Sequence, residues 1–161
     1  LQYRTRFIEL AAEVNGDMPR WVVERTAEAL NDAQKPLNGS RVHVLGVSYK
    51  PDVDDVRESP AIDIIKILRQ RGALVDFHDP LVETLDVDGE AIGSVALTIE
   101  RLEGADAVVI ATDHSEMDYG TIGRHARIIV DPRNAMKDPG LSVVYPIAGP
   151  PRRAETVSQP A

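Results

Sequence analysis

Apolar residues occur along this chain in short continuous runs, separated by helical stripes and polar turns. Continuous runs of this length are typical of strands that are buried on both faces of a parallel sheet. They predict five strands, within residues 41–47, 73–80, 105–112, 127–132 and 141–147. Strands that alternate with helices favour an α/β domain with an open, mostly parallel sheet and helices on both faces.

One helix of this domain is marked at both ends. Ser59 is a candidate N-cap, Pro60 takes the first helical position, and Gly72 ends the helix. The predicted buried stripe of this helix consists of Ala61, Ile64, Ile65 and Leu68.

Residues 81–104 carry weaker patterns. They predict a short strand around residues 95–97 and a helical turn at residues 99–103. The segment DVDGE (residues 86–90) resembles part of a calcium loop, but its glycine stands at the wrong offset. We therefore expect an ordinary acidic turn there and no metal site.

The N-terminal residues predict a helical arm before the domain. Asn15-Gly16-Asp17 and Pro19 divide the arm into two helical stretches, and residues 31–40 have the composition of a linker. The apolar stripes of the two stretches are Phe7, Leu10, Ala11 and Val14, then Val23, Ala27 and Leu30. The predicted organisation is an arm with its linker (1–37), an α/β domain (38–148) and a disordered tail without apolar periodicity (149–161).

Composition excludes several classes of function. The 161 residues contain 18 lysines and arginines against 26 acids, for a net charge of -8 and no basic run. Nucleic acids and anionic membranes are therefore not expected as partners. No apolar stretch approaches 20 residues, so the protein is expected to be cytoplasmic. The chain has no cysteine, which removes disulfides, thiolate metal sites and thiol nucleophiles.

Polar residues gather where the predicted strands end. Three loops, at residues 48–57, 112–116 and 131–137, follow carboxyl ends of strands and carry charges or hydroxyls. Ligands of open α/β sheets bind at this edge, so the three loops predict a site. Asp and Asn are also ordinary turn formers, and many of these residues could serve only to shape the loops.

Familiar phosphate-binding motifs do not fit the first loop. Gly46 is followed by Ser48 and Pro51 at the other two glycine positions of the dinucleotide fingerprint, and the P-loop pattern is absent. Asp54 and Asp55 match a phosphorylated receiver site only in part.

The histidines show no spacing of metal ligands. His43 alternates with apolar strand residues and is expected to be a strand residue with satisfied bonds, and His125 carries no signal. His78 and His114 lie at strand ends, but we assign a catalytic role to neither.

Several segments, in the correct order, resemble one enzyme family. They are LGVSYKPDVDDVRESPA, GALVDFHDP, AVVIATDHSEMDY and IIVDPRNAM. Together they resemble the C-terminal domain of the UDP-glucose/GDP-mannose dehydrogenase family, a Rossmann-like domain that binds the UDP part of the substrate. The segment TRFIELAAEVNGDMPRWVV is similar to the central helix that pairs subunits in that family, so the likeness extends from about residue 3 to residue 147. Details favour the branch that oxidises UDP-N-acetylhexosamines.

The resemblance implies an NAD-dependent, four-electron oxidation of the sugar C6 hydroxyl to a carboxylate. In the family, an N-terminal Rossmann domain binds NAD, and a cysteine before the central helix forms a covalent intermediate. This chain contains neither the dinucleotide fingerprint nor a cysteine. We therefore expect it to be roughly the last two-fifths of such an enzyme, inactive alone and without catalytic residues of its own.

The resemblance also assigns the charges of the first loop. Tyr49 and Lys50 match the aromatic-lysine pair that contacts the substrate nucleotide, and Arg57 matches an arginine that reaches NAD on the other domain. An ion pair of Arg57 with Asp54, Asp55 or Glu58 is the alternative, and both can hold. Arg133 falls where the family places another substrate-contacting arginine, although Asn134 could be the matching position.

The remaining polar residues of the three loops are given structural roles. Asp52 and Asp55 are expected to orient Lys50, Arg57 and the loop backbone. Thr112 and Asp113 belong to the same rim, as contacts or as structural residues.

Two other classes of function remain open at this point. A stand-alone nucleotide-binding or regulatory module would have the same fold without the chemistry. A hydrolase or phosphotransfer protein that uses the acidic loop is less favoured, because no paired nucleophile and base is evident.

Overall fold

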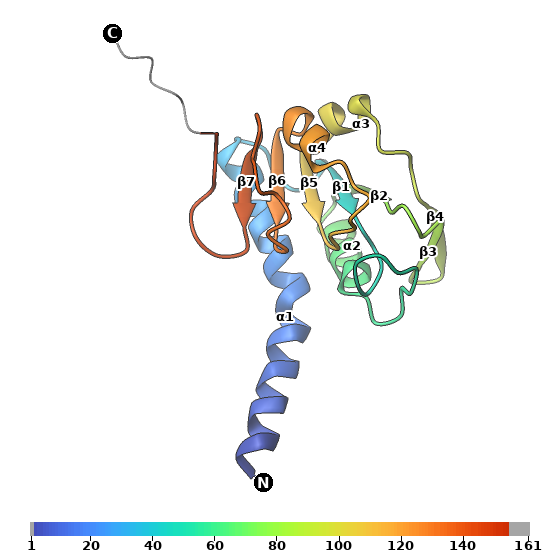
Figure 1. Ribbon diagram of the computed structural model, residues 1–161, viewed down its shortest axis with the longest axis vertical. Helices are drawn as coiled ribbons and strands as arrows, with labels where there is room; N and C mark the ends of the chain where they lie inside the picture. The colour runs from blue at the N-terminus through green and yellow to red at the C-terminus, as the bar shows by residue number, and fades with distance from the viewer. Residues whose placement is uncertain (1, 155–161) are drawn as a thin grey trace.

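The computed structural model describes the backbone of residues 2–154 and the side chains of residues 16–154. Five parallel strands form the main sheet in the order β2-β1-β5-β6-β7 (Figure 1). The strands are β1 (Arg41–Leu45), β2 (Leu74–His78), β5 (Ala107–Ile110), β6 (Ile128–Asp131) and β7 (Val143–Pro146). All five lie within the apolar runs of the sequence, and the predicted α/β class is confirmed.

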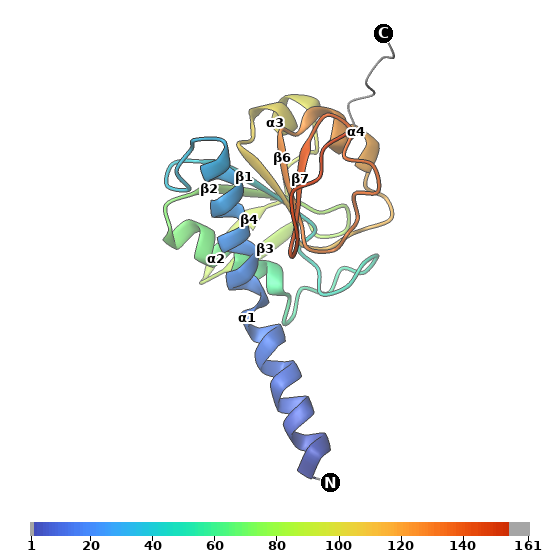
Figure 2. The same ribbon diagram turned by 90° about the vertical axis from the view of Figure 1, so that its left-hand side faces the viewer.

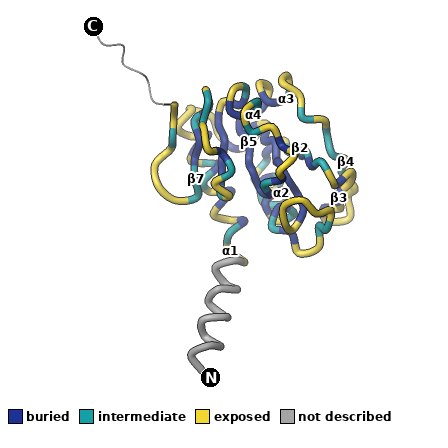
Figure 3. The backbone as a smooth tube through the Cα atoms, in the orientation of Figure 1, coloured by how far each residue is buried: buried dark blue, intermediate teal, exposed yellow. Residues whose placement is uncertain are grey.

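Helices cover both faces of the sheet (Figure 2). On one face, α1 (Gln2–Asp32) and α2 (Pro60–Gln70) pack on inward-facing strand residues such as Val44 and Val109. On the other face, α3 (Ile99–Gly104) and α4 (Tyr119–His125) pack on their neighbours, among them Ile110. Because successive side chains of a strand point to opposite faces, β1, β5, β6 and β7 contribute to both cores, whereas Val75 and Phe77 of β2 join the core beneath α1 and α2. The dark blue sheet strands of Figure 3 show this burial.

The helix α2 forms as its sequence predicts. The Ser59 hydroxyl accepts a hydrogen bond from the Ala61 N–H at 3.3 Å, and Pro60 begins the helix. The four residues of the predicted stripe are all buried. Gly72, with a φ of 86°, lets the chain turn back into β2.

The helix α1 differs from the sequence prediction because it is continuous through Pro19. A proline inside a helix removes one hydrogen bond and costs about 3 kcal/mol. Burial of Val22, Val23 and Leu30 against the sheet offsets this cost, since each fully buried side chain contributes about 2 kcal/mol. Tertiary packing therefore overrides the local signal for a break. The predicted stripe of residues 7–14 lies outside the described side chains.

The C-terminal half of α1 is part of the domain, although the sequence suggested an arm joined by a linker. Val23 and Leu30 are fully buried in the same core as α2. The Arg25 Nε donates to the carbonyl of Pro146 at 2.8 Å, and the Tyr145 hydroxyl donates to Asp32 at 3.0 Å. These bonds attach the helix to β7 as well as to the sheet face.

A hairpin that the sequence analysis did not anticipate occupies residues 84–93. Its strands, β3 (Thr84–Val87) and β4 (Glu90–Gly93), pair antiparallel in a second sheet. Asp88 and Gly89 form the turn, both with positive φ, so DVDGE is the acidic turn that was expected. The short strand predicted at residues 95–97 does not form. The helical turn at residues 99–103 is confirmed as part of α3.

The chain beyond residue 148 is described as far as residue 154. Val144 and Arg152 exchange two backbone hydrogen bonds of 2.7 and 2.8 Å, which form an antiparallel bridge at the edge of the sheet. The tail predicted to be disordered from residue 149 is therefore paired with β7 at Arg152. Residues 155–161 lie outside the described residues. Among the described residues, no helix is long and apolar enough to cross a membrane.

Gly46 gives the first test of this packing. It follows β1 with a φ of 75°, and a Cβ at this position would collide with the carbonyl oxygen of Thr112. Gly46→Ala should lower the free energy of unfolding by about 3 kcal/mol or more, from the strained φ and the clash together. Chemical denaturation would measure the loss.

The matched control for this substitution is Gly39→Ala. Gly39 has a φ of 82°, but nothing lies within 4 Å of the added carbon, so only about 1 kcal/mol should be lost. Equal losses for the two variants would contradict a close approach of the loops after β1 and β5.

Candidate functional site

The carboxyl ends of the central strands bring the predicted loops together around a cavity of about 580 Å³. The helix α1 forms one wall, and the loops after β1, β5 and β6 together with the start of α2 form the rest. The lining residues are Met18, Pro19, Val22, Tyr49, Lys50, Pro51, Glu58, Pro60, Ile64, Ala111, Pro132 and Arg133. The contribution of α1 could not be predicted from the sequence, because nothing in its apolar stripe indicates that the helix passes over the ends of the strands.

Three of the four predicted binding residues line this cavity. They are Tyr49 and Lys50 from the loop after β1, and Arg133 from the loop after β6. The Lys50 ammonium lies 5.4 Å from the centroid of the Tyr49 ring. The Arg133 Nε donates to the carbonyl of Ala111 at 2.7 Å, which anchors the guanidinium at the cavity.

Arg133, and not its neighbour Asn134, lines the cavity. The buried Asp131 carboxylate accepts hydrogen bonds from the backbone N–H groups of Arg133, Ala135 and Met136 at 2.9 to 3.2 Å. Asn134 takes a φ of 56° within this turn, a conformation that asparagine tolerates better than most residues. The turn thus presents Arg133 and uses Asn134 for its geometry.

Arg57 lies outside the cavity lining, with 86% of its side chain exposed. Its Nε and Nη2 atoms donate to the two oxygens of Asp55 at 2.9 and 2.7 Å. These bonds hold the pKa of Asp55 down at about 2. The ion pair that the sequence analysis gave as an alternative for Arg57 is therefore present.

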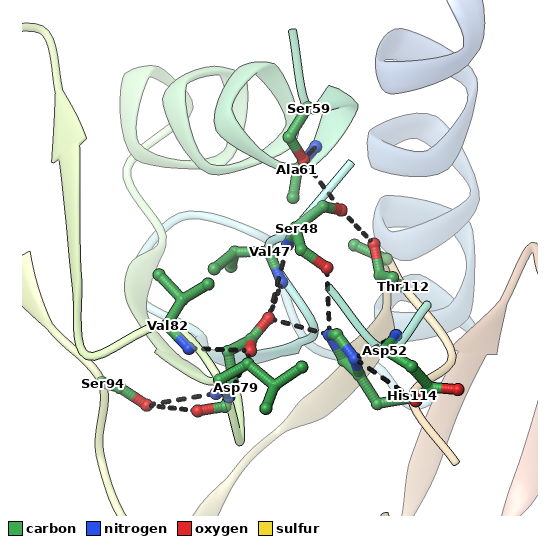
Figure 4. Close-up of polar contacts among 12 residues, drawn as sticks. Val47, Ser48, Asp52, Ser59, Ala61, Asp79, Val82, Ser94, Thr112 and His114 are labelled. Atoms are coloured by element: carbon green, nitrogen blue, oxygen red, sulfur yellow. Dashed lines mark hydrogen bonds and ion pairs between the residues drawn. The ribbon is translucent and has the colours of Figure 1, made fainter. Parts of the chain in front are cut away.

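Asp79 at the end of β2 is a buried carboxylate with both oxygens in use (Figure 4). Oδ2 accepts from the N–H groups of Val47 at 2.7 Å and Ser48 at 3.3 Å. Oδ1 accepts from those of Leu81 at 2.9 Å and Val82 at 3.1 Å. From the sequence, Asp79-Pro80 was predicted only to end a strand, because no local pattern indicates that the Asp79 carboxylate is buried.

His114, from the loop after β5, is fully buried beside Asp79. Its Nε2 lies 3.0 Å from the Asp79 Oδ2 and 3.1 Å from the Ser48 hydroxyl, and its Nδ1 lies 2.9 Å from the Asp52 backbone nitrogen. A backbone N–H can only donate, so Nδ1 accepts and the proton resides on Nε2. The hydrogen-bond partners of the two ring nitrogens therefore assign the tautomer.

These contacts hold the loops together, and they do not place Ser48 and His114 as the nucleophile and base of a hydrolase. Ser48 is fully buried, and its hydroxyl donates to the carbonyl of Lys50 at 2.7 Å. A serine nucleophile needs an accessible hydroxyl whose proton passes to a base. The hydrolase alternative therefore gains no support from this cluster.

The loop after β5 holds the loop after β1 by two further contacts, and Figure 4 labels the residues of the first, Thr112 and Ser48. The Thr112 hydroxyl donates to the carbonyl of Ser48 at 2.7 Å. The N–H and the hydroxyl of Ser115 donate to Asp52 Oδ1 at 2.8 and 2.9 Å, and these bonds lower the pKa of Asp52. Asp52 thus orients the loop backbone, as the sequence analysis expected.

A second cavity, of about 680 Å³, lies beside β2 and α3 and contains none of the predicted binding residues. His43 and Asp76 line it, with the His43 Nδ1 2.5 Å from Asp76 Oδ1. The His43 Nε2 is buried without a partner among the described residues, so the expectation that His43 is fully satisfied is wrong for one nitrogen. Among the described residues, no group of histidines and acids has the arrangement of a metal site.

The sequence of this chain is similar to those of nucleotide-sugar dehydrogenases. The family model for the UDP-glucose/GDP-mannose dehydrogenase family, UDP binding domain, matches residues 43–138. A UDP-N-acetyl-D-mannosamine dehydrogenase of Pyrococcus horikoshii is 34% identical over 143 residues, which are 86% of this chain and 32% of the relative. A UDP-glucose 6-dehydrogenase of Rickettsia bellii is 33% identical over 141 residues, 83% of this chain and 32% of the relative.

Solved structures agree with the sequence comparisons. The structure of a UDP-D-MAnNAc dehydrogenase from Pyrococcus horikoshii superposes with a TM-score of 0.73 at 33% identity, covering 87% of this chain and 33% of that one. The chain spans about a third of the length of the curated relatives that it matches.

Asp79→Asn tests whether the buried carboxylate organises the site. The amide nitrogen of Asn would face backbone N–H groups that now donate to an oxygen, so at least two donors would lose their acceptor. We expect the free energy of unfolding to fall by about 3 kcal/mol, measured by urea denaturation.

Asp118→Asn is the matched control. Asp118 caps α4 by accepting from the Thr121 N–H at 3.0 Å, on an exposed surface. Asparagine also caps helices, so the change should cost less than about 1 kcal/mol. A loss for Asp79→Asn no greater than that of the control would contradict the organising role of Asp79.

Proposed function

Because the chain belongs to the UDP-glucose/GDP-mannose dehydrogenase family, we propose that its cavity binds the nucleotide diphosphate of a UDP-sugar. The whole enzyme would be an NAD-dependent UDP-sugar 6-dehydrogenase, in which this chain is the C-terminal nucleotide-sugar-binding domain. The observation that carries the proposal is the meeting of Lys50 and Arg133 in one cavity at the carboxyl ends of the strands.

Charge supports this assignment. The chain has a net charge of -8, so a diphosphate needs cations at its own site to overcome the overall field. Lys50 offers three donors on a point charge, and Arg133 offers the N–H groups that remain beside its bond to Ala111. Glu58, which also lines the cavity, would repel a phosphate but suits the hydroxyls of a ribose.

The remaining lining suits the base and the sugar. Met18, Val22 and Ile64 give the cavity an apolar wall, and the half-exposed Tyr49 ring offers a flat face. Small-molecule sites commonly combine apolar walls with a few convergent polar groups. We assign Tyr49 to stacking or edge contact with the nucleotide, beside the ammonium of Lys50.

The finer chemistry is proposed from the relatives. Two of them are named UDP-N-acetyl-D-mannosamine and UDP-glucose dehydrogenases, and we favour a UDP-N-acetylhexosamine as the substrate. Two NAD molecules would each accept one hydride from the C6 carbon of the sugar, while a water molecule supplies the second oxygen of the carboxylate. Arg57, exposed beyond the rim of the cavity, would reach an NAD molecule held mainly by another domain.

UDP binding by the 161-residue chain tests the proposal. Contacts from only part of a cleft leave a few kcal/mol of net binding, so the dissociation constant should lie in the high micromolar to millimolar range. In an NMR titration, shifts should cluster at residues 47–52 and 131–134. Lys50→Ala should remove most of the binding, Arg133→Ala part of it, and added salt should weaken it.

Lys66→Ala is the matched control for loss of a positive charge. Lys66 pairs with Asp88 at 2.9 Å and does not line the cavity, so UDP affinity should stay unchanged. Arg57→Ala should likewise matter little for UDP, because its proposed partner is NAD. Shifts elsewhere, or unchanged binding in Lys50→Ala, would show that the site is misplaced.

A separate assay addresses the reaction. With no cysteine among its 161 residues, the chain should bind UDP-N-acetylmannosamine or UDP-N-acetylglucosamine without turnover. Absorbance at the NADH band should therefore stay at background when NAD and either sugar are added. NADH formation by this chain alone would contradict the proposal that the chemistry requires another domain.

A further inference from the structure

We propose that His114 is a positioning residue for the nucleotide, acting through the loop of residues 48–52 that carries Tyr49 and Lys50. The proposal rests on the proposed function of the cavity. His114 does not line that cavity and would touch no ligand itself. Its effect would come from one tautomer of a neutral ring, with an unprotonated Nδ1 that holds the loop in its binding geometry.

The side chains of Tyr49 and Lys50 do not hold themselves in place. Both residues are exposed, and among the residues whose side chains are described the Lys50 ammonium contacts the Tyr49 ring, 5.4 Å from its centroid. Their positions therefore depend on the backbone of the loop. A mobile loop would have to be ordered when the ligand binds, which lowers affinity.

His114 contacts this backbone from both ring nitrogens. Nδ1 accepts the Asp52 N–H at 2.9 Å, just after the binding pair. On the other side, Nε2–H is shared between Asp79 Oδ2 and the Ser48 hydroxyl, and Ser48 in turn donates to the Lys50 carbonyl at 2.7 Å. One buried ring thus connects the fixed end of β2 to the residues before and after Tyr49-Lys50.

The geometry of Asp52 makes the Nδ1 contact the critical one. Asp52 has a φ of 61°, which is uncommon for residues other than glycine and must be stabilised by its surroundings. Ser115 holds its side chain, and His114 holds its backbone N–H. Losing the acceptor would leave a partly buried donor without a partner and release the turn.

Two substitutions distinguish the hydrogen bond of Nδ1 from that of Nε2. The amide oxygen of Asn falls close to the position of Nδ1, so His114→Asn can still accept the Asp52 N–H while it loses Asp79. The longer Gln places its amide near Nε2, so His114→Gln can still donate to Asp79 while it loses Asp52. If His114 positions the loop, UDP affinity should fall about tenfold in the Gln variant and less than about twofold in the Asn variant.

The order of stabilities should be the reverse of the order of affinities. His114→Asn loses the bond to a buried carboxylate, the stronger of the two contacts, so its thermal unfolding midpoint should fall further than that of His114→Gln. A purely structural histidine would make affinity follow stability. An Asn variant that binds UDP less well than the Gln variant would therefore overturn the proposal.

The tautomer is checked in the ligand-free wild-type chain. A two-bond ¹⁵N–¹⁵N coupling should connect the Asp52 amide nitrogen with His114 Nδ1, and the Nδ1 shift should be that of an unprotonated ring nitrogen. Absence of the coupling, or a protonated Nδ1, would overturn the proposal even if neither variant folds. His125→Gln is the control, because His125 is only partly buried and its Nδ1 lies 2.9 Å from Glu103 on α3, far from the loop of residues 48–52 in the sequence; UDP affinity should not change.

The two proposals fail in different ways. If the wild-type chain does not bind UDP, the proposed function is wrong. The loop can still be judged from amide exchange at Tyr49, Lys50 and Asp52, which should rise in His114→Gln and stay near wild type in His114→Asn. Exchange that rises in neither variant would show that His114 does not hold the loop.

Discussion

The Asp79 carboxylate is the interaction on which the rest of this sheet edge depends. It is buried, and an unpaired charge in that position would be strongly unfavourable. Backbone donors from two loops and the ring of His114 surround it, so the charge is stabilised only while the chain ends of β1, β2 and β5 are in register. The hydrogen bonds to Asp79 also restrict the backbone after β1 to one conformation. The positions of the exposed residues in that loop follow from this conformation.

The hydrogen bonds of the loop between β1 and α2 explain why this segment contains so many charged residues. Asp52 accepts two bonds from Ser115, and Asp55 pairs with Arg57 while its carbonyl accepts the Tyr49 N–H at 2.7 Å. These acids bind the loop to its neighbours and to itself. Lys50 is left facing the cavity, which is the charge that a diphosphate would require.

The sequence predicted the elements whose formation depends on residues that lie close together in the chain. The strands are continuous apolar runs, and α2 has its cap, its proline and its stripe within residues 59–68, so no distant contact is needed to define them. The continuity of α1 through Pro19 was not predictable in that way, because it depends on packing against α2, β5 and β6, which follow much later in the sequence. The hairpin of residues 84–93 was missed because two strands of four residues give too few positions to establish a period of two.

In the candidate site, too, some residues could be predicted from sequence motifs, whereas the roles of others depend on tertiary contacts. Tyr49, Lys50 and Arg133 could be named from the motifs of the family resemblance, and the structure brings these three to one cavity. His114 and Asp79 could not be given their place from sequence, because their partners come from three separate loops and only the folded sheet edge shows which atoms meet. Similarly, the wall formed by Met18 and Val22 arises because α1 both covers the sheet and passes its edge. A helix that is required for the core is thereby also required for the shape of the cavity, and Val22 belongs to both the core and the wall of the proposed binding site.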